Sequence, residues 1–232
     1  MTHDSVIAID GPAASGKSST AAAVARALGF VHVDSGSLYR ALTWVSVQRR
    51  VEDPSVILAE AERLHVGLQP TGQGLALHID GVDDVDLAIR ATDVNASVSA
   101  IAAMPSLRDW VNVRVREVVR RLPGAVIDGR DIGTVVMPDA PLKVFLTATA
   151  AARAERRLMQ RGGEVDRRLL EAETADLVER DRRDSGRATA PLTEPRDAIR
   201  VDTTAMTFDQ QVARILELAR QRGLGSGPEA RG

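Results

Sequence analysis

The sequence predicts an α/β protein in which a parallel sheet of five strands is covered by helices on both faces. A short apolar run at 6–10 is followed by a glycine-rich turn and an alanine-rich stretch at 19–28, the order expected for a strand, a loop and a helix. Four further apolar runs alternate with helical patterns along the chain. Strands that alternate with helices pair in parallel, because each helix carries the chain back across the sheet before the next strand begins.

The later elements follow from hydrophobic spacing and from residues that start and end helices. The four further strands are expected at 30–33, 125–128, 142–146 and 198–202. Helices are expected at 37–49, 92–103, 105–122, 150–160 and 166–184, and from 207 onwards. Pro105 opens one of these helices, Pro123 and Gly124 end it, and Thr207 and Gln210 form a capping-box pattern at the start of the last.

A different pattern interrupts this alternation between about 63 and 100. Short alternating runs over 67–87, the last of them Val85 to Ala88, are separated by turn signals and predict a small antiparallel sheet. We therefore expect one domain over 1–232 with three local features. They are an inserted subdomain at about 63–100, a short helical lid at about 162–187 and a disordered tail at about 223–232.

The composition excludes several classes of function. The chain is 44% hydrophobic and 27% charged with a net charge of −2, which is typical of a globular protein without a global basic field for nucleic acid or membranes. It has no cysteine, which excludes disulfides and thiolate metal sites, and only 3% aromatic residues, too few for a base-stacking platform. No apolar run approaches the ~20 residues of a membrane span. We expect a cytoplasmic monomer that binds neither nucleic-acid polymers nor membranes.

The turn after the first strand has the pattern of a phosphate-binding loop. Gly11-Pro12-Ala13-Ala14-Ser15-Gly16-Lys17-Ser18 fits GxxxxGK[ST] at every constrained position. Gly11 and Gly16 let the backbone N–H groups point inward, and the following helix adds the positive end of its dipole. Lys17 can reach the β- and γ-phosphates of ATP, and the Ser18 hydroxyl can ligate Mg²⁺. Lys17 is one of only two lysines among 30 basic residues, which indicates that this position requires a compact cation.

Charged residues gather where other elements end at the same edge of the sheet. Asp128 ends the third strand, where it is a Mg²⁺ ligand or a capping residue, and we favour the ligand because a triphosphate site needs one. The segment 179–187 alternates in charge and contains Gly186, which is typical of a lid that exchanges internal ion pairs for phosphate contacts. The arginines expected at the cleft are Arg40, Arg130, Arg153, Arg157, Arg180, Arg183 and Arg187.

The sequence contains no Ser-His-Asp or Cys-His arrangement and no obvious general base. An acceptor that is itself a phosphate needs none, because it is already mostly a dianion at pH 7. The pattern therefore favours transfer from phosphate to phosphate. A kinase of another nucleoside monophosphate or of a small metabolite remains an alternative. A nucleotide-driven switch is less favoured, because the Asn-Lys-x-Asp guanine motif is absent and a pure binder needs neither acceptor-side arginines nor a lid.

Five motifs together resemble the bacterial cytidylate kinases over about 6–222. They are GPAASGKSS, DSGSLYR at 34–40, DGRDIGTVVMPDAP at 128–141, ERDRRDSGR at 179–187 and ATAPL at 188–192. The resemblance implies ATP-dependent phosphorylation of CMP and dCMP. It also implies three parts: a core, an insertion that binds the nucleoside monophosphate, and a lid.

The resemblance and the residue patterns together assign expected roles. For phosphoryl transfer these fall on Lys17, Arg130, Arg153, Arg180, Arg183 and Arg187. For ATP they fall on Gly11, Pro12, Ala13, Ala14, Ser15, Gly16, Lys17, Ser18, Ser19 and Arg157, and for Mg²⁺ on Ser18 and Asp128. The resemblance places acceptor-phosphate contacts at Ser35, Tyr39, Arg40 and Arg130, cytosine contacts at Ser99, Arg108 and Asp131, and sugar and lid contacts at Arg180, Asp184 and Arg187. Arg114 and Arg116 stay unassigned, because Val115-Arg116 replaces the usual Gln-Arg pair of the family.

Overall fold

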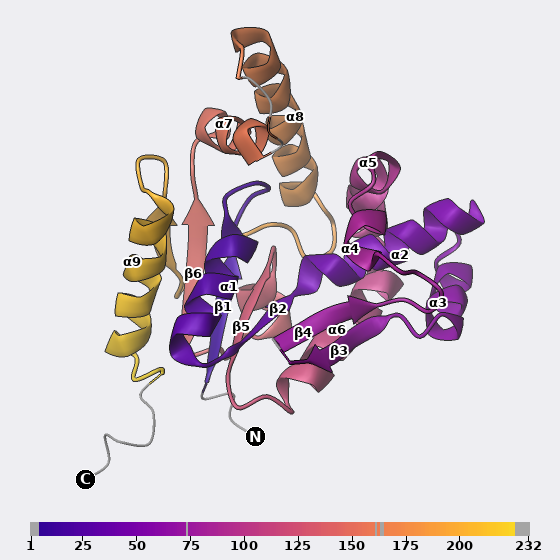
Figure 1. The fold of residues 1–232 in the computed structure, drawn as a ribbon, viewed down its shortest axis with the longest axis horizontal. Helices are drawn as coiled ribbons and strands as arrows, with labels where there is room; N and C mark the ends of the chain where they lie inside the picture. Colours follow the sequence, from indigo (N-terminus) through magenta and orange to yellow (C-terminus); the bar gives the residue numbers. More distant parts are fainter. Residues whose placement is uncertain (1–4, 73, 161, 163–164, 226–232) are drawn as a thin grey trace. The chain divides into compact units, whose positions relative to one another are not determined.

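Five strands form one sheet in the order β2-β5-β1-β6-β7 (Figure 1). The strands are β1 Val6–Asp10, β2 Val31–Asp34, β5 Ala125–Gly129, β6 Leu142–Thr147 and β7 Ile199–Asp202. β1 pairs in parallel with β5 and β6, and β6 pairs in parallel with β7, which confirms the predicted sheet. The register sets Asp10 opposite Gly129 and Phe145, so the carboxyl ends of β1, β5 and β6 lie at the same edge of the sheet.

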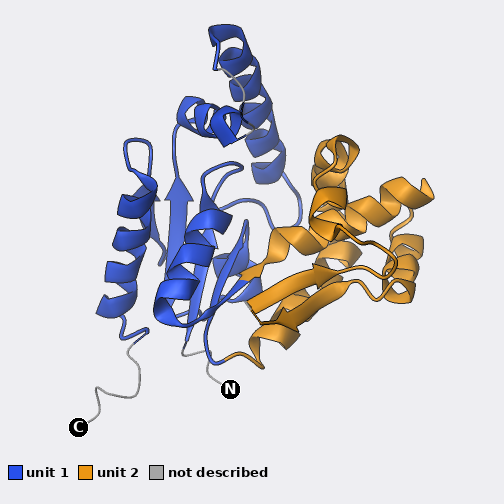
Figure 2. Cartoon of the chain, in the orientation of Figure 1, with its two compact units in different colours: residues 1–32, 123–232 blue, residues 33–122 orange. Residues whose placement is uncertain are grey.

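The computed structural model describes residues 5–72, 74–160, 162 and 165–225. The chain divides into two compact units, which Figure 2 colours separately. Unit 1 comprises 1–32 and 123–232, and unit 2 comprises 33–122. The range of unit 2 includes the whole of the segment predicted as an insertion, about 63–100, together with the helices before and after it. Residues 226–232 of the predicted disordered tail lie outside the described residues.

The main core of unit 1 lies between the sheet and the helices α1 Lys17–Leu28 and α9 Phe208–Gln221. Ile7, Leu142 and Ile215 are fully buried members of this cluster. The α9 helix begins with the predicted capping box, in which the Thr207 hydroxyl accepts from the Gln210 amide and the Gln210 side chain accepts from the Thr207 amide. The apolar faces of α1 and α9 therefore belong to the same core as β1, the strand that leads into the phosphate loop.

Two further helices of unit 1, α7 Ala150–Gln160 and α8 Arg167–Ser185, lie side by side (Figure 1). Ala154 of α7 and Leu177 of α8 pack with Ala13 of the phosphate loop in a small buried cluster. This apolar contact fixes the predicted lid helix against the loop in the structure. Among the described residues, no helix has both the length and the apolar character needed to cross a membrane.

Unit 2 contains mostly helices and one antiparallel hairpin. Its elements are α2 Ser35–Arg49, α3 Pro54–Arg63, β3 Gly67–Thr71, β4 Gly74–His78, α4 Val85–Ala88, α5 Thr92–Ile101 and α6 Pro105–Val119. Strands β3 and β4 confirm the small antiparallel sheet. The strand predicted at Val85 to Ala88 is wrong: it is a single helical turn, because the Asp84 carboxylate accepts from the Leu87 amide at 2.9 Å.

The helix α3 was not predicted, although its start signal is present in the sequence. Asp53 precedes Pro54, and its carboxylate accepts from the amides of Ser55 and Val56. An N-cap aspartate followed by a proline at the first helical position is a strong start pattern. Ile57 and Ala61, four residues apart, are the buried side chains of this short amphipathic helix.

Candidate functional site

The backbone of the phosphate loop takes conformations that favour glycine at two positions. Gly11 has φ 151° and Gly16 has φ 87°. A Cβ atom on Gly11 would lie 2.0 Å from the Leu146 carbonyl oxygen, so no other residue fits between β1 and β6 there. Ala14 is left-handed as well, with φ 57°, which costs a residue with a side chain about 1–2 kcal/mol. The loop is thus held in an unfavourable backbone shape of the kind that makes an anion-binding nest.

Lys17, the cation of this loop, is buried. Its side chain is 5% exposed, and Nζ donates to the Pro12 carbonyl oxygen at 2.6 Å and to Ser15 Oγ at 3.3 Å. Burial lowers the pKa of Lys17 well below its usual value, and the positive charges of Arg130 and Arg180 lower it further. The negative charges of Asp128 and Asp10 act in the opposite direction and raise the pKa of Lys17. A lysine bonded to the phosphate loop places positive charge where a polyanionic ligand would bind.

The two residues predicted to bind a metal are brought together. Ser18 Oγ donates to Asp128 Oδ2 at 2.6 Å, and Asp128 Oδ1 lies 2.7 Å from His32 Nε2. Burial alone would raise the pKa of Asp128, but the bonds from His32 and Ser18 and the Lys17 charge lower it below its usual value. Asp128 is therefore held as a carboxylate. A hydroxyl and a carboxylate oxygen are the hard ligands that Mg²⁺ prefers, and Mg²⁺ usually takes only one or two from the protein.

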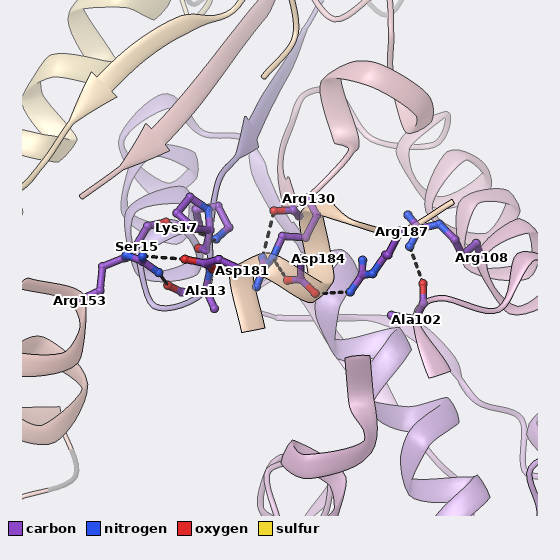
Figure 3. A network of polar contacts seen from close by, with 12 residues as sticks. Ala13, Ser15, Lys17, Ala102, Arg108, Arg130, Arg153, Asp181, Asp184 and Arg187 are labelled. Atoms are coloured by element: carbon purple, nitrogen blue, oxygen red, sulfur yellow. Dashed lines mark hydrogen bonds and ion pairs between the residues drawn. The ribbon is translucent and has the colours of Figure 1, made fainter. Parts of the chain in front are cut away.

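A buried carboxylate joins two of the predicted arginines (Figure 3). Asp184 is 1% exposed, and it accepts from Arg130 Nε at 3.1 Å and from Arg187 Nη2. Arg187 is itself nearly buried, so this ion pair is weakly screened by solvent. The predicted internal ion pairs of 179–187 are confirmed here and at Glu179, which pairs with Arg182 and Arg183.

Arg153 of α7 connects the phosphate loop to α8. Its guanidinium donates to the carbonyl oxygens of Ala13 at 2.7 Å and Ala148 at 3.0 Å, and it pairs with Asp181 at 2.7 Å. The Asp181 carboxylate in turn accepts from the Ala13 amide at 3.2 Å (Figure 3). The helix α8 therefore places a carboxylate on the phosphate loop itself.

Arg157 and Arg183, two more of the arginines predicted at the cleft, are more exposed than Arg153 and Arg187. Arg157 pairs with Glu173 at 2.9 Å between α7 and α8. Arg183 is exposed and faces Glu179, so the structure does not bring it to the buried network around Asp184.

The comparisons with known proteins agree with this geometry. The family model described as cytidylate kinase matches residues 7–221. The chain belongs to the cytidylate kinase family. A cytidylate kinase of Geobacillus sp. (strain WCH70) is 39% identical and aligns with 96% of this chain and 99% of its own length. That of Stutzerimonas stutzeri (strain A1501) is 42% identical over 94% and 96%.

A longer relative carries a second activity in its name. The bifunctional pantoate ligase/cytidylate kinase of Synechococcus elongatus is 45% identical over 97% of this chain. The chain spans 44% of the length of that relative. The match covers both units described above and confirms the resemblance that the sequence motifs indicate.

In unit 2, residues that the sequence analysis predicted to bind the acceptor make three contacts. Arg40 Nη1 donates to Asn95 Oδ1 at 2.6 Å. Arg108 is 2% exposed, lies 5.3 Å from the centre of the Tyr39 ring and donates to the Ala102 carbonyl oxygen at 2.8 Å. Ser35 is buried at the start of α2, and Ser99 is half-buried on α5.

The sequence analysis missed His32 and Asp181 in the unit 1 site, and it gave no role to Asp10, the buried acid at the end of β1. His32 meets Asp128 only because β2 lies beside β5, and strand order cannot be read from the chain. Asp181 lies in a segment with several acidic residues, and the sequence does not show which of them contacts the phosphate loop. Asp10 had a readable signal, since it is the acid that ends an otherwise apolar buried strand.

Proposed function

We propose that the chain is an ATP-dependent cytidylate kinase, which transfers the γ-phosphoryl group of ATP to the phosphate of CMP or dCMP. An acceptor oxygen bonds to the γ-phosphorus, the bond from that phosphorus to the bridging oxygen breaks, and ADP leaves. The observation that carries this proposal is that Lys17 and Arg153 both bond to the phosphate loop, at Pro12 and Ala13, while Arg130 and Arg187 meet at the buried Asp184. Two nucleotides of like charge approach each other only where cations offset their repulsion.

Mg²⁺ is part of the proposal, with Ser18 and Asp128 as the residues that would hold it. The ion would neutralise charge on the β- and γ-phosphate oxygens of ATP. The two side chains already meet at 2.6 Å, and the pKa of Asp128 is lowered, so the donor set fits a hard divalent cation. His32, at the other oxygen of Asp128, would orient that carboxylate.

The acceptor contacts are proposed residue by residue from the family match. They are Ser35, Tyr39, Arg40, Ser99, Arg108, Arg130, Asp131, Arg180, Asp184 and Arg187. We also propose that the protein is a monomer and acts in the cytoplasm, where ATP and CMP are present.

A substrate panel tests the proposed function. ATP consumption is measured with CMP, dCMP, UMP, AMP and dTMP supplied in turn at equal concentration. We expect CMP and dCMP to be phosphorylated with kcat/KM well above that of the other three, because a site built for buried polar contacts rejects mismatched bases strongly. Faster turnover of UMP, AMP or dTMP would show that the acceptor is assigned wrongly.

The lid proposal predicts a change in hydrogen exchange. Glu179, Asp184 and their arginine partners form ion pairs within 179–187, and phosphate groups would compete for those arginines. Amide exchange over 179–187 should therefore slow when a CMP–ATP bisubstrate analogue binds. Exchange over the middle of α9, which packs on the core, serves as the control and should not change. Equal exchange over 179–187 with and without the analogue would exclude a closing lid.

A further inference from the structure

Asp10 is a buried acid that the proposed chemistry does not use. It is 1% exposed at the end of β1, directly before the phosphate loop. Its two oxygens accept from successive backbone amides of another segment, Oδ1 from Ile132 at 2.8 Å and Oδ2 from Gly133 at 2.7 Å. Burial raises the pKa of Asp10 to about 6, although both hydrogen bonds act to lower it. Burial of a carboxyl group costs folding free energy, which indicates that the contacts of Asp10 serve the function of the protein.

The segment that Asp10 holds is an unusual turn. Residues Ile132–Val136, η1, form one turn of π-helix, a rare element that is frequent at functional sites. The Asp131 carbonyl oxygen accepts from the amides of Val135 at 2.8 Å and Val136 at 3.2 Å, so the backbone of Asp131 is the first acceptor of that turn. Arg130 and Asp131 directly precede it.

The turn is held from a second side as well. A Cβ atom on Gly133 would lie 2.9 Å from Pro195 Cγ, 3.1 Å from Lys143 Cδ and 3.3 Å from Asp10 Oδ2, so Gly133 fits closely among these three side chains. Lys143, the second lysine of the chain, is itself buried, and its Nζ pairs with Asp197 at 2.8 Å. Contacts from β1, from β6 and from the segment before β7 therefore surround this one glycine.

We propose that Asp10 is a positioning residue that fixes the turn after β5 and so sets the place of the Arg130 and Asp131 side chains. The proposal rests on the proposed function, in which these two side chains contact the acceptor. Catalytic and binding groups need placement to about 0.5 Å, and a displacement of about 1 Å can cost about 10²-fold in rate. A carboxylate suits the task, because it offers acceptor oxygens to two adjacent N–H groups at once.

The test is Asp10→Asn, which keeps the size of the side chain but replaces one acceptor with an NH₂ donor. That donor would face a backbone N–H, so one of the two hydrogen bonds is lost. The matched control is Ile215→Val, a modest cavity-forming change in the core between the sheet and α9. Both variants are assayed well below their unfolding temperatures.

For Asp10→Asn we expect kcat/KM for CMP to fall by about 10-fold or more, the CMP-to-UMP selectivity to fall with it, and KM for ATP to stay within about twofold. Ile215→Val should leave all three values unchanged. Retention of CMP efficiency and selectivity in Asp10→Asn would overturn the proposal. So would a parallel fall in the CMP and ATP parameters, since that pattern indicates a general structural role.

Hydrogen exchange separates this proposal from the proposed function. In Asp10→Asn, amides over 131–137 should exchange faster than in the wild type, while Ile215→Val leaves them protected. This readout needs no substrate, so it tests the hold on the turn even if the substrate panel were to reject CMP as the acceptor. Unchanged exchange over 131–137 in Asp10→Asn would overturn the inference by itself.

Discussion

Replacing Lys17 with alanine is expected to lower kcat by about 10²-fold or more, the usual loss when one electrostatic stabiliser of a transition state is removed. Lys17 is the buried cation of the phosphate loop, and its Nζ donates to the Pro12 carbonyl oxygen and to Ser15 Oγ. In phosphoryl transfer, negative charge is spread over the oxygens of the moving group, and Lys17 is placed to stabilise it. The measurement is kcat for CMP phosphorylation at saturating ATP and CMP.

Two companion variants make this result specific. Lys17→Met keeps most of the side-chain volume without the charge, and it should be as slow as Lys17→Ala if charge is what matters. Arg121→Ala removes an exposed cation on unit 2 and should keep wild-type turnover. Near wild-type kcat in a folded Lys17→Ala protein would refute the role of Lys17.

Asp131→Asn is expected to remove most of the preference for CMP over UMP. Cytosine presents an amine donor where uracil presents an oxygen, so a carboxylate can accept from the first and repels the second. Asp131 is 3% exposed, and a mismatch of buried polar groups in such a site can discriminate by about 10⁴-fold. An asparagine amide offers either a donor or an acceptor. The CMP rate should therefore fall while the ratio of the two kcat/KM values approaches one.

The control for this variant is Asp139→Asn, the same chemical change on an exposed side chain a short distance along the chain. It should alter neither substrate. If Asp131→Asn lowers CMP and UMP efficiency equally and leaves their ratio intact, Asp131 holds its loop and does not read the base.

The sequence by itself determined the strands, the phosphate loop and the family. Strands and helices were predictable because their apolar spacing is local, and the loop because eight consecutive residues carry its geometry. The wrong prediction of a strand at Val85 to Ala88 also has a local cause. The alternating pattern there is too short to distinguish a strand from a helix, and the Asp84 side chain caps a helical turn instead. The charged segment 179–187 was correctly predicted to pair internally, since those partners lie three or four residues apart.

Only the tertiary structure decided which of the many charged side chains meet. Ser18 and Asp128 are 110 residues apart, and His32 joins them because β2 lies beside β5 in the sheet. Asp10 reaches the amides of Ile132 and Gly133 across more than 120 positions. No propensity or spacing encodes such contacts. They exist because burial removes the competing water, so a carboxylate at the end of a strand must find its donors on whichever segment packs beside it.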